Sequence, residues 1–141
     1  MTLSEIIPNL FVGSATDAKQ FAVDHPNAAI LCVLEARPAD EPLKSMHVSI
    51  LQPNPENSMA NVKQLDICGL VIDHVLKMGG QIMIHCMAGI QRGPLTVVWY
   101  LSNLNKISID EAYKIVKEKH PETEYDITWL PSNIIGKAVI G

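Results

Sequence analysis

Apolar residues recur every three or four positions between residues 59 and 78, which is the spacing of one face of an amphipathic helix. Gly79 and Gly80 follow this stretch, and glycines commonly end a helix because they adopt the backbone conformation that its C-terminus requires. The pattern therefore predicts a helix over residues 59–78. Its apolar positions are Val62, Leu65, Cys68, Ile72 and Val75.

Short apolar runs that end in polar or turn-forming residues predict buried strands. A strand pair is expected first, with Pro8 and Asn9 in its turn, because these residue types favour tight turns. A loop with two prolines, QPNPENS, separates the third apolar run from the long helix. The predicted strands lie within residues 6–13, 28–34, 46–51 and 81–85.

Start and stop signals predict further helices. Ser108 and Glu111 have the spacing of a capping box, which opens a helix that continues to about Lys119 and ends at His120-Pro121. Pro94 suits the first turn of another helix, where its missing N–H has no hydrogen bond to lose. The remaining predicted helices cover residues 17–25, with Thr16 or Asp17 as the cap, 94–104 and 131–139.

Strands that alternate with helices predict an α/β fold with a central, mostly parallel sheet flanked by helices. The 141 residues are enough for one compact core, so we expect a single domain over residues 1–141. Open α/β sheets bind ligands beyond the carboxyl ends of their strands. The strand at residues 81–85 would therefore deliver Cys86 to the binding edge.

The net charge is −4, from 11 basic and 15 acidic residues, which argues against a general nucleic-acid or membrane-surface binder. We expect neither a secretory leader nor a membrane helix, because the longest apolar run falls far short of the ~20 residues that a span needs. The three cysteines do not suggest a disulfide framework. A reducing, cytoplasmic location is therefore expected.

Residues 84–95 read IHCMAGIQRGPL, with five residues between Cys86 and Arg92 and a helix directly afterwards. A thiolate at the base of such a loop can attack phosphorus, while backbone N–H groups and the helix N-terminus bind phosphoryl oxygens. Arg92 supplies a planar guanidinium that can hold two oxygens. The loop is therefore expected to bind phosphate, sulfate or vanadate through Met87, Ala88, Gly89, Ile90, Gln91 and Arg92.

These residues resemble those of the small dual-specificity protein phosphatases in the cysteine-dependent protein tyrosine phosphatase superfamily. The family loop is His-Cys, five residues, Arg, then Ser or Thr, and the chain reads HCMAGIQRG. The similarity extends to SEIIPNLFVGS, to residues 46–51, to the helix before GGQIMIHC and to Pro131-Ser132-Asn133. It implies a protein tyrosine phosphatase-like fold and hydrolysis of phosphotyrosine esters, with phosphoserine and phosphothreonine as further substrates.

The resemblance also implies a role for four residues. Cys86 would be the nucleophile that forms a phosphocysteine intermediate, and Arg92 would bind the phosphoryl group and stabilise its transition state. His85 would support the loop and the thiolate, and Gly89 would permit the tight backbone turn. The implied partner is a phosphorylated protein or peptide, and the implied reaction uses no cofactor and no metal.

The chain departs from the family pattern at two positions. Gly93 replaces the usual Ser or Thr, whose hydroxyl supports the thiolate, so we expect slow breakdown of the intermediate. Asn54, 32 residues before Cys86, occupies the place of the usual general-acid aspartate and cannot donate a proton. We therefore expect weak activity that favours phosphotyrosine and other activated esters. Equal candidates for a replacement acid are Glu56 in the same loop and the later cluster of Glu122, Glu124 and Asp126.

Other functions remain open from the residues alone. Asn54 and Gly93 favour a pseudophosphatase that binds phosphorylated partners without turnover, whereas the presence of Cys86 and Arg92 opposes it. RNA 5′-phosphates and phosphoinositides are weaker substrate candidates, because the residues between Cys86 and Arg92 are uncharged. Sulfur transfer and arsenate reduction also use a loop thiolate, but the resemblance along the chain lies elsewhere.

The remaining cysteines and histidines have simpler interpretations. Cys68 lies on the apolar face of the long helix and Cys32 in a buried strand, so both favour core packing. Cys32 has a second possible role as a redox partner that protects Cys86 in a reversible disulfide. The other histidines show no metal-ligand spacing and favour structural or surface roles; they are His25, His47, His74 and His120.

Overall fold

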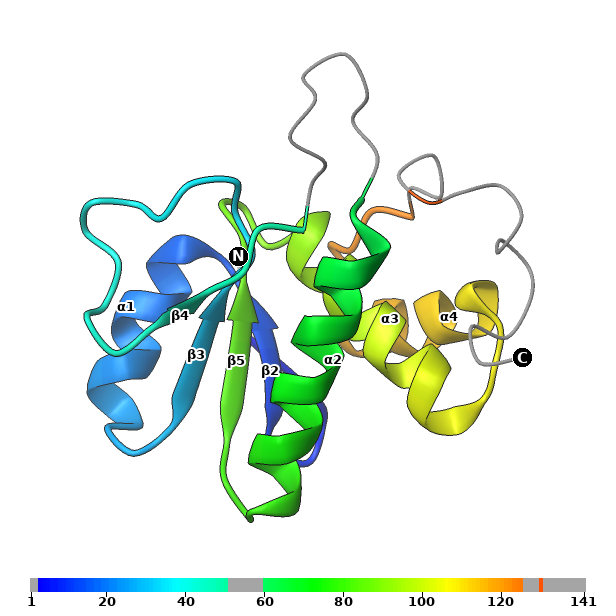
Figure 1. Cartoon of the computed structure of the whole chain (residues 1–141), viewed down its shortest axis with the longest axis horizontal. Helices are drawn as coiled ribbons and strands as arrows, with labels where there is room; N and C mark the ends of the chain where they lie inside the picture. The colour runs from blue at the N-terminus through cyan, green and yellow to red at the C-terminus, as the bar shows by residue number, and fades with distance from the viewer. Residues whose placement is uncertain (1–2, 51–59, 126–129, 131–141) are drawn as a thin grey trace.

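The computed structural model describes residues 3–50, 60–125 and 130. Within these ranges, five strands form one sheet in the order β1-β2-β5-β3-β4 (Figure 1). β1 and β2 pair antiparallel, and the other pairs are parallel, which confirms the predicted mostly parallel α/β sheet. The elements are β1 (Ser4–Ile7), β2 (Leu10–Gly13), α1 (Ala15–Asp24), β3 (Ala29–Cys32), β4 (Met46–His47), α2 (Val62–Lys77), β5 (Ile82–His85), α3 (Arg92–Asn105) and α4 (Ile109–Lys119).

Helices cover both faces of the sheet. Figure 1 shows α1 on one side and α2, α3 and α4 on the other. The side chains of β5 alternate accordingly: Met83 packs with Phe21 of α1, whereas Ile82 and Ile84 belong to the larger core. All four β5 side chains, including His85, are fully buried, as expected for a parallel strand that has a helix layer on each side.

The first helix begins earlier than the sequence predicted. α1 starts at Ala15 because Ser14 is its N-cap, in place of the predicted Thr16 or Asp17. The Ser14 hydroxyl accepts a hydrogen bond from the Asp17 N–H at 3.0 Å, and the Asp17 carboxylate accepts one from the Ser14 N–H at 2.9 Å. Asp17 is therefore the third helical residue of a capping box, and the interpretation of Asp17 as the cap was wrong.

The predicted strand at residues 46–51 is the second difference. In the described part of that range, the strand is only the two-residue, exposed β4, which pairs with β3 alone. A short edge strand leaves few backbone groups open to another chain, so the exposure of β4 carries little risk of edge-to-edge aggregation. The predicted long amphipathic helix is confirmed as α2, although it begins at Val62, after its cap Asn61, and not at residue 59. The predicted helix at 131–139 lies outside the described residues.

Candidate active site

The loop of residues 86–91 connects β5 to α3 at the edge of the sheet toward which β2, β3 and β5 all point (Figure 1). Cys86 lies at its base and is 3% exposed, and Arg92 is the first residue of α3. A cavity of about 130 Å³ is lined by Cys86, Met87, Ala88, Ile90, Gln91 and Arg92. The fold thus places the predicted nucleophile and the predicted phosphate-binding cation around one small pocket.

Gly89 is buried beneath this pocket and does not line it. Its φ of +76° lies in the left-handed region that favours glycine. A Cβ atom on Gly89 would lie 2.7 Å from the Gly13 carbonyl carbon and 2.9 Å from the Ser14 nitrogen. Both the turn and the close approach of the loop to the end of β2 therefore require glycine at this position.

His85 is fully buried behind the loop and contacts a polar group through each ring nitrogen. Nδ1 lies 3.1 Å from the Cys86 carbonyl oxygen, which can only accept, so Nδ1 donates this hydrogen bond. Nε2 lies 2.6 Å from Oε2 of Glu41, whose side chain is 2% exposed. The two contacts fix the ring that supports the Cys86 backbone, and sequence reasoning had not identified Glu41.

His120 holds the loop from the opposite side. It is fully buried, and its Nε2 donates to the Gly89 carbonyl oxygen at 2.7 Å. Nδ1 then accepts from the Ser4 hydroxyl at 2.6 Å, so the ring links β1 to the Cys86 loop. The structural interpretation of His120 was right in kind, but the sequence had not shown that this residue braces the candidate site.

Two of the candidate acids follow His120 and differ in position. The backbone N–H of Glu124 donates to the Ile90 carbonyl oxygen at 2.7 Å, and its carboxylate accepts from the Gln91 side chain at 2.6 Å. Glu122 approaches the His120 ring instead, at 3.4 Å. Glu124 therefore contacts the pocket wall, whereas Glu122 lies next to His120, behind the loop. The other candidates, Glu56 and Asp126, lie outside the described residues, as does Asn54.

Arg92 extends to a carboxylate that the sequence analysis had not considered. Its Nη2 lies 2.9 Å from Oε1 of Glu35, in the segment after β3, and the two side chains are 26% and 54% exposed. An exposed ion pair of this kind contributes little to stability. The pair nevertheless places the negative charge of Glu35 next to the Arg92 guanidinium, to which a phosphoryl group would bind.

Gly93 lies directly beside the nucleophile. A Cβ atom at this position would lie 3.6 Å from the Cys86 sulfur and 3.2 Å from a methyl group of Val12. A side chain on residue 93 would therefore reach the thiol, which is the contact that the usual hydroxyl makes in the resembled family. As a glycine, residue 93 offers no side-chain hydrogen bond to the sulfur.

All three cysteines lie in the described ranges, and each is a free thiol. Burial raises the pKa of the Cys32 thiol, and the nearby Glu41 carboxylate acts in the same direction. Burial raises the pKa of Cys68 on α2 to about 12, which fits the predicted core role. Neither thiol is therefore an alternative nucleophile at neutral pH.

A larger groove of about 460 Å³ lies between α2 and α3 and is less suited to phosphate. The two acidic residues that line it face its aromatic wall, because Asp66 accepts from the Trp99 indole at 2.8 Å and Asp73 accepts from the Tyr100 hydroxyl at 3.0 Å. Burial, together with the Asp73 carboxylate, raises the pKa of Tyr100 to about 12. These acids would repel an anion, so the smaller cavity, which Cys86 lines, is the better candidate for a phosphate-binding site.

Comparison with protein families supports the resemblance. The model for "Dual specificity phosphatase, catalytic domain" matches residues 10–129. Human dual specificity protein phosphatase 16 is 26% identical over 129 residues, which cover 90% of this chain and 19% of that protein. Dual specificity protein phosphatase YVH1 of Plasmodium falciparum is 34% identical over 79 residues, or 56% of this chain and 13% of that protein. The chain therefore spans only a small part of the length of these relatives.

Solved structures show the same fold. A mouse putative dual specificity phosphatase superposes with a TM-score of 0.73 at 21% identity, over 90% of this chain and 80% of that one. The human tyrosine phosphatase-like serine/threonine/tyrosine-interacting protein superposes with a TM-score of 0.71 at 21% identity, over 90% of this chain and 89% of that one. The predicted protein tyrosine phosphatase-like fold is confirmed.

In the ranges that the structure describes, no helix combines the length and apolar character that a membrane crossing requires. The family model covers most of the chain, including the whole Cys86 loop with its cysteine and arginine. This chain belongs to the dual specificity phosphatase family.

Proposed function

We propose that this chain hydrolyses phosphate monoesters on proteins, with phosphotyrosine favoured, through a phosphocysteine intermediate on Cys86. The observation that carries the proposal is the shared cavity of Cys86 and Arg92 at the carboxyl end of β5. The N-terminus of α3 begins at the same loop and adds its partial positive charge to that of Arg92. Together these groups favour both a thiolate and a bound phosphoryl group.

The reaction would proceed in two displacements. The Cys86 sulfur attacks phosphorus, the bond between phosphorus and the ester oxygen breaks, and the leaving oxygen takes up a proton. Water then attacks the phosphocysteine, which releases inorganic phosphate and regenerates the thiolate. Arg92 stabilises the charge on the equatorial oxygens in both steps, a type of contribution that is typically ~10²–10³-fold in rate.

The preference for phosphotyrosine follows from the leaving group. A phenolate leaves without full protonation more readily than an alkoxide, so an aryl ester depends less on a general acid. Glu124 is the best-placed described candidate for that acid, because its carboxylate contacts Gln91 at the pocket wall. Met87 is 61% exposed at the rim, which offers an apolar contact for an aromatic ring.

The test is hydrolysis of an aryl phosphate across pH in a metal-free buffer. We expect turnover by the wild type and none by Cys86→Ser. Glu124→Gln should flatten the basic limb of the pH profile, whereas Glu122→Gln is the matched control because Glu122 faces His120 instead of the pocket. An unchanged profile in Glu124→Gln would assign the acid elsewhere, with Glu56 and Asp126 as the next candidates.

The second candidate function is phosphate recognition without turnover. Gly93 favours it, because a residue that should help the sulfur to leave has no side chain next to Cys86. In that case the wild type would show no hydrolysis, yet it would bind vanadate or a phosphotyrosine peptide. Arg92→Ala would abolish this binding, because the guanidinium is the principal cation of the pocket.

A further inference from the structure

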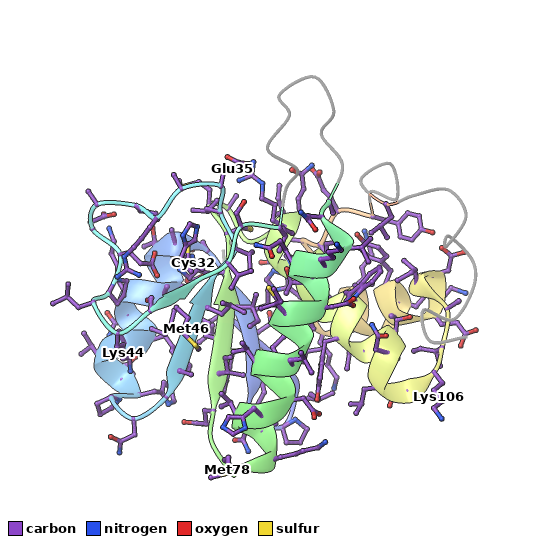
Figure 2. All side chains as sticks on the ribbon, in the orientation of Figure 1. Cys32, Glu35, Lys44, Met46, Met78 and Lys106 are labelled. Carbon is purple, nitrogen blue, oxygen red and sulfur yellow. The ribbon has the colours of Figure 1, made fainter. Side chains whose placement is uncertain are left out.

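Three side chains of different chemistry meet behind the Cys86 loop. Cys32 ends β3, His85 ends β5, and Glu41 comes from the segment between β3 and β4. Cys32 and His85 are directly paired across the parallel strands. The Cys32 sulfur, a ring nitrogen of His85 and a carboxylate oxygen of Glu41 all lie within 4.8 Å of one another, and all three residues are buried. Figure 2 labels Cys32 at this end of the sheet.

The donor set matches zinc. Thiolate sulfur, imidazole nitrogen and carboxylate oxygen are the three ligand types that zinc uses in proteins, usually in tetrahedral geometry. Calcium and magnesium prefer oxygen ligands alone, so the Cys32 sulfur disfavours both. Three protein ligands would leave a fourth coordination position for water or another small ligand.

The orientation of His85 suits a metal ligand. Its Nδ1–H donates to the Cys86 carbonyl oxygen, so Nε2 is the nitrogen that faces Glu41. Metal-bound histidines commonly donate the other ring N–H to a carbonyl or carboxylate, which fixes the ring and the tautomer. The Cys86 carbonyl would therefore be the outer partner that holds His85 in place for coordination.

The segment that carries Glu41 is itself held in shape. Arg37 donates to the carbonyl oxygens of Ser45 at 2.8 Å and Pro42 at 2.7 Å, and the Glu41 N–H donates to the Pro38 carbonyl at 3.1 Å. Nitrogen and oxygen ligands of tetrahedral zinc lie about 3.4 Å apart, so the 2.6 Å contact between His85 and Glu41 must open by about 1 Å. Zinc binding therefore requires the Glu41 carboxylate to move away from the His85 Nε2 by that amount.

Charge balance also favours a divalent ion. A thiolate and a carboxylate together carry two negative charges, which one Zn²⁺ neutralises in a buried site. Burial raises the pKa of Cys32, so the metal-free thiol is protonated at neutral pH and binding must release that proton.

We propose that Cys32, Glu41 and His85 form a Zn²⁺ site behind the catalytic loop, separate from the Cys86 pocket. The reaction proposed above needs no metal, and this ion takes no part in it. His85, the residue before Cys86, would then be a ligand of the ion and also the donor of a hydrogen bond to the Cys86 carbonyl oxygen.

The test is titration of the reduced protein with Zn²⁺ against a competing chelator, with Co²⁺ as a spectroscopic probe. We expect one ion per chain and a sulfur-to-cobalt charge-transfer band. Cys32→Ser should abolish the band and weaken Zn²⁺ binding at least tenfold, and Glu41→Gln should weaken it similarly. Cys68→Ser is the matched control, because Cys68 is another fully buried thiol outside the cluster. Circular dichroism verifies that each variant is folded.

Cys86→Ser separates this site from the catalytic thiol, and it should bind Zn²⁺ as tightly as the wild type. Loss of binding in Cys86→Ser with retention in Cys32→Ser would overturn the proposal, because the metal would then sit in the catalytic pocket. Failure of the wild type to bind Zn²⁺ would also overturn it and leave the cluster as a hydrogen-bonded support. No readout involves ester hydrolysis, so either result leaves the proposed phosphatase activity untouched.

Discussion

The Cys86 loop has an inner side and an outer side, and the two are held by different kinds of contact. On the inner side, His85 and His120 are fully buried and hydrogen-bond the loop backbone at Cys86 and Gly89. On the outer side, Met87 is 61% exposed, and the ion pair of Arg92 reaches a half-exposed carboxylate.

The difference separates two tasks. Buried hydrogen bonds leave costly unpaired groups when one partner is removed, so changes on the inner side should affect both stability and loop geometry. Exposed charges are screened by water, so changes on the outer side should alter substrate affinity and leave the fold intact. Four substitutions, in order of decreasing expected effect, test this division.

The largest effect is expected for Gly89→Ala on the inner side. Its Cβ would lie 2.7 Å from the backbone of Gly13, in addition to the strain of a positive φ. We expect a loss of about 3 kcal/mol or more in the free energy of unfolding, together with loss of turnover. Denaturant unfolding followed by circular dichroism measures it.

Gly79→Ala is the matched control for that substitution. Gly79 has a φ of +79°, but nothing lies within 4 Å of its added Cβ. It should cost only about 1 kcal/mol, the penalty of a left-handed backbone alone. Equal losses in the two variants would show that the close approach of the loop to β2 has no energetic importance.

His120→Phe should have the next largest effect. It keeps an aromatic ring but leaves the Gly89 carbonyl and the Ser4 hydroxyl without their partner. We expect a loss of about 2 kcal/mol in stability and a rise of roughly tenfold in KM. His120→Gln can still donate a hydrogen bond to the Gly89 carbonyl oxygen, so its KM should lie much closer to the wild-type value than that of His120→Phe. A KM equal to that of the wild type in His120→Phe would limit this residue to a purely structural role.

Gly93→Ser tests the boundary between the two sides, because its hydroxyl would lie beside the Cys86 sulfur. We expect breakdown of the phosphocysteine to accelerate by about fivefold, since a hydrogen bond to a charged group contributes ~1.5 kcal/mol or more and Val12 must shift slightly. Rapid-quench kinetics would show a smaller burst than in the wild type. Gly93→Ala adds the same Cβ without the hydroxyl, and an equal acceleration there would refute the hydrogen-bond explanation.

Glu35→Gln on the outer side should have the smallest effect. It removes the carboxylate that lies 2.9 Å from Arg92, so a phosphoryl group meets less competition and less repulsion. We expect KM for an aryl phosphate to fall by about two- to fivefold, with unchanged stability. Asp40→Asn is the control, because Asp40 is an exposed acid of the same segment that pairs with Lys19. A similar fall in both variants would indicate a general charge effect.

The sequence predicted what depends on local spacing. The apolar repeat that ends at Gly79 identified α2, and the five residues between Cys86 and Arg92 identified the loop at the end of a parallel strand. Cap choice was less secure, because Ser14, Thr16 and Asp17 are all good caps and only the backbone decides among them.

The supports of the loop could not be predicted in the same way. Glu41 lies 44 positions from its partner His85, and His120 lies 31 positions from Gly89. No periodicity or motif connects residues so far apart, because the topology of the sheet brings them together. The ion pair between Glu35 and Arg92 is of the same kind, since an exposed acid after a strand has no distinctive sequence signal.

The hydrogen bond between Ser4 and His120 has a consequence for where the unit that supports the Cys86 loop begins. The family model matches from residue 10, yet Ser4 in β1 orients the ring that holds Gly89. A fragment trimmed to the matched region would keep every residue of the Cys86 loop but would lose the Ser4 hydroxyl that orients His120, one of the two internal supports of the loop. The practical boundary for expressing or transplanting this unit therefore lies before β1, several residues earlier than the family model alone would place it.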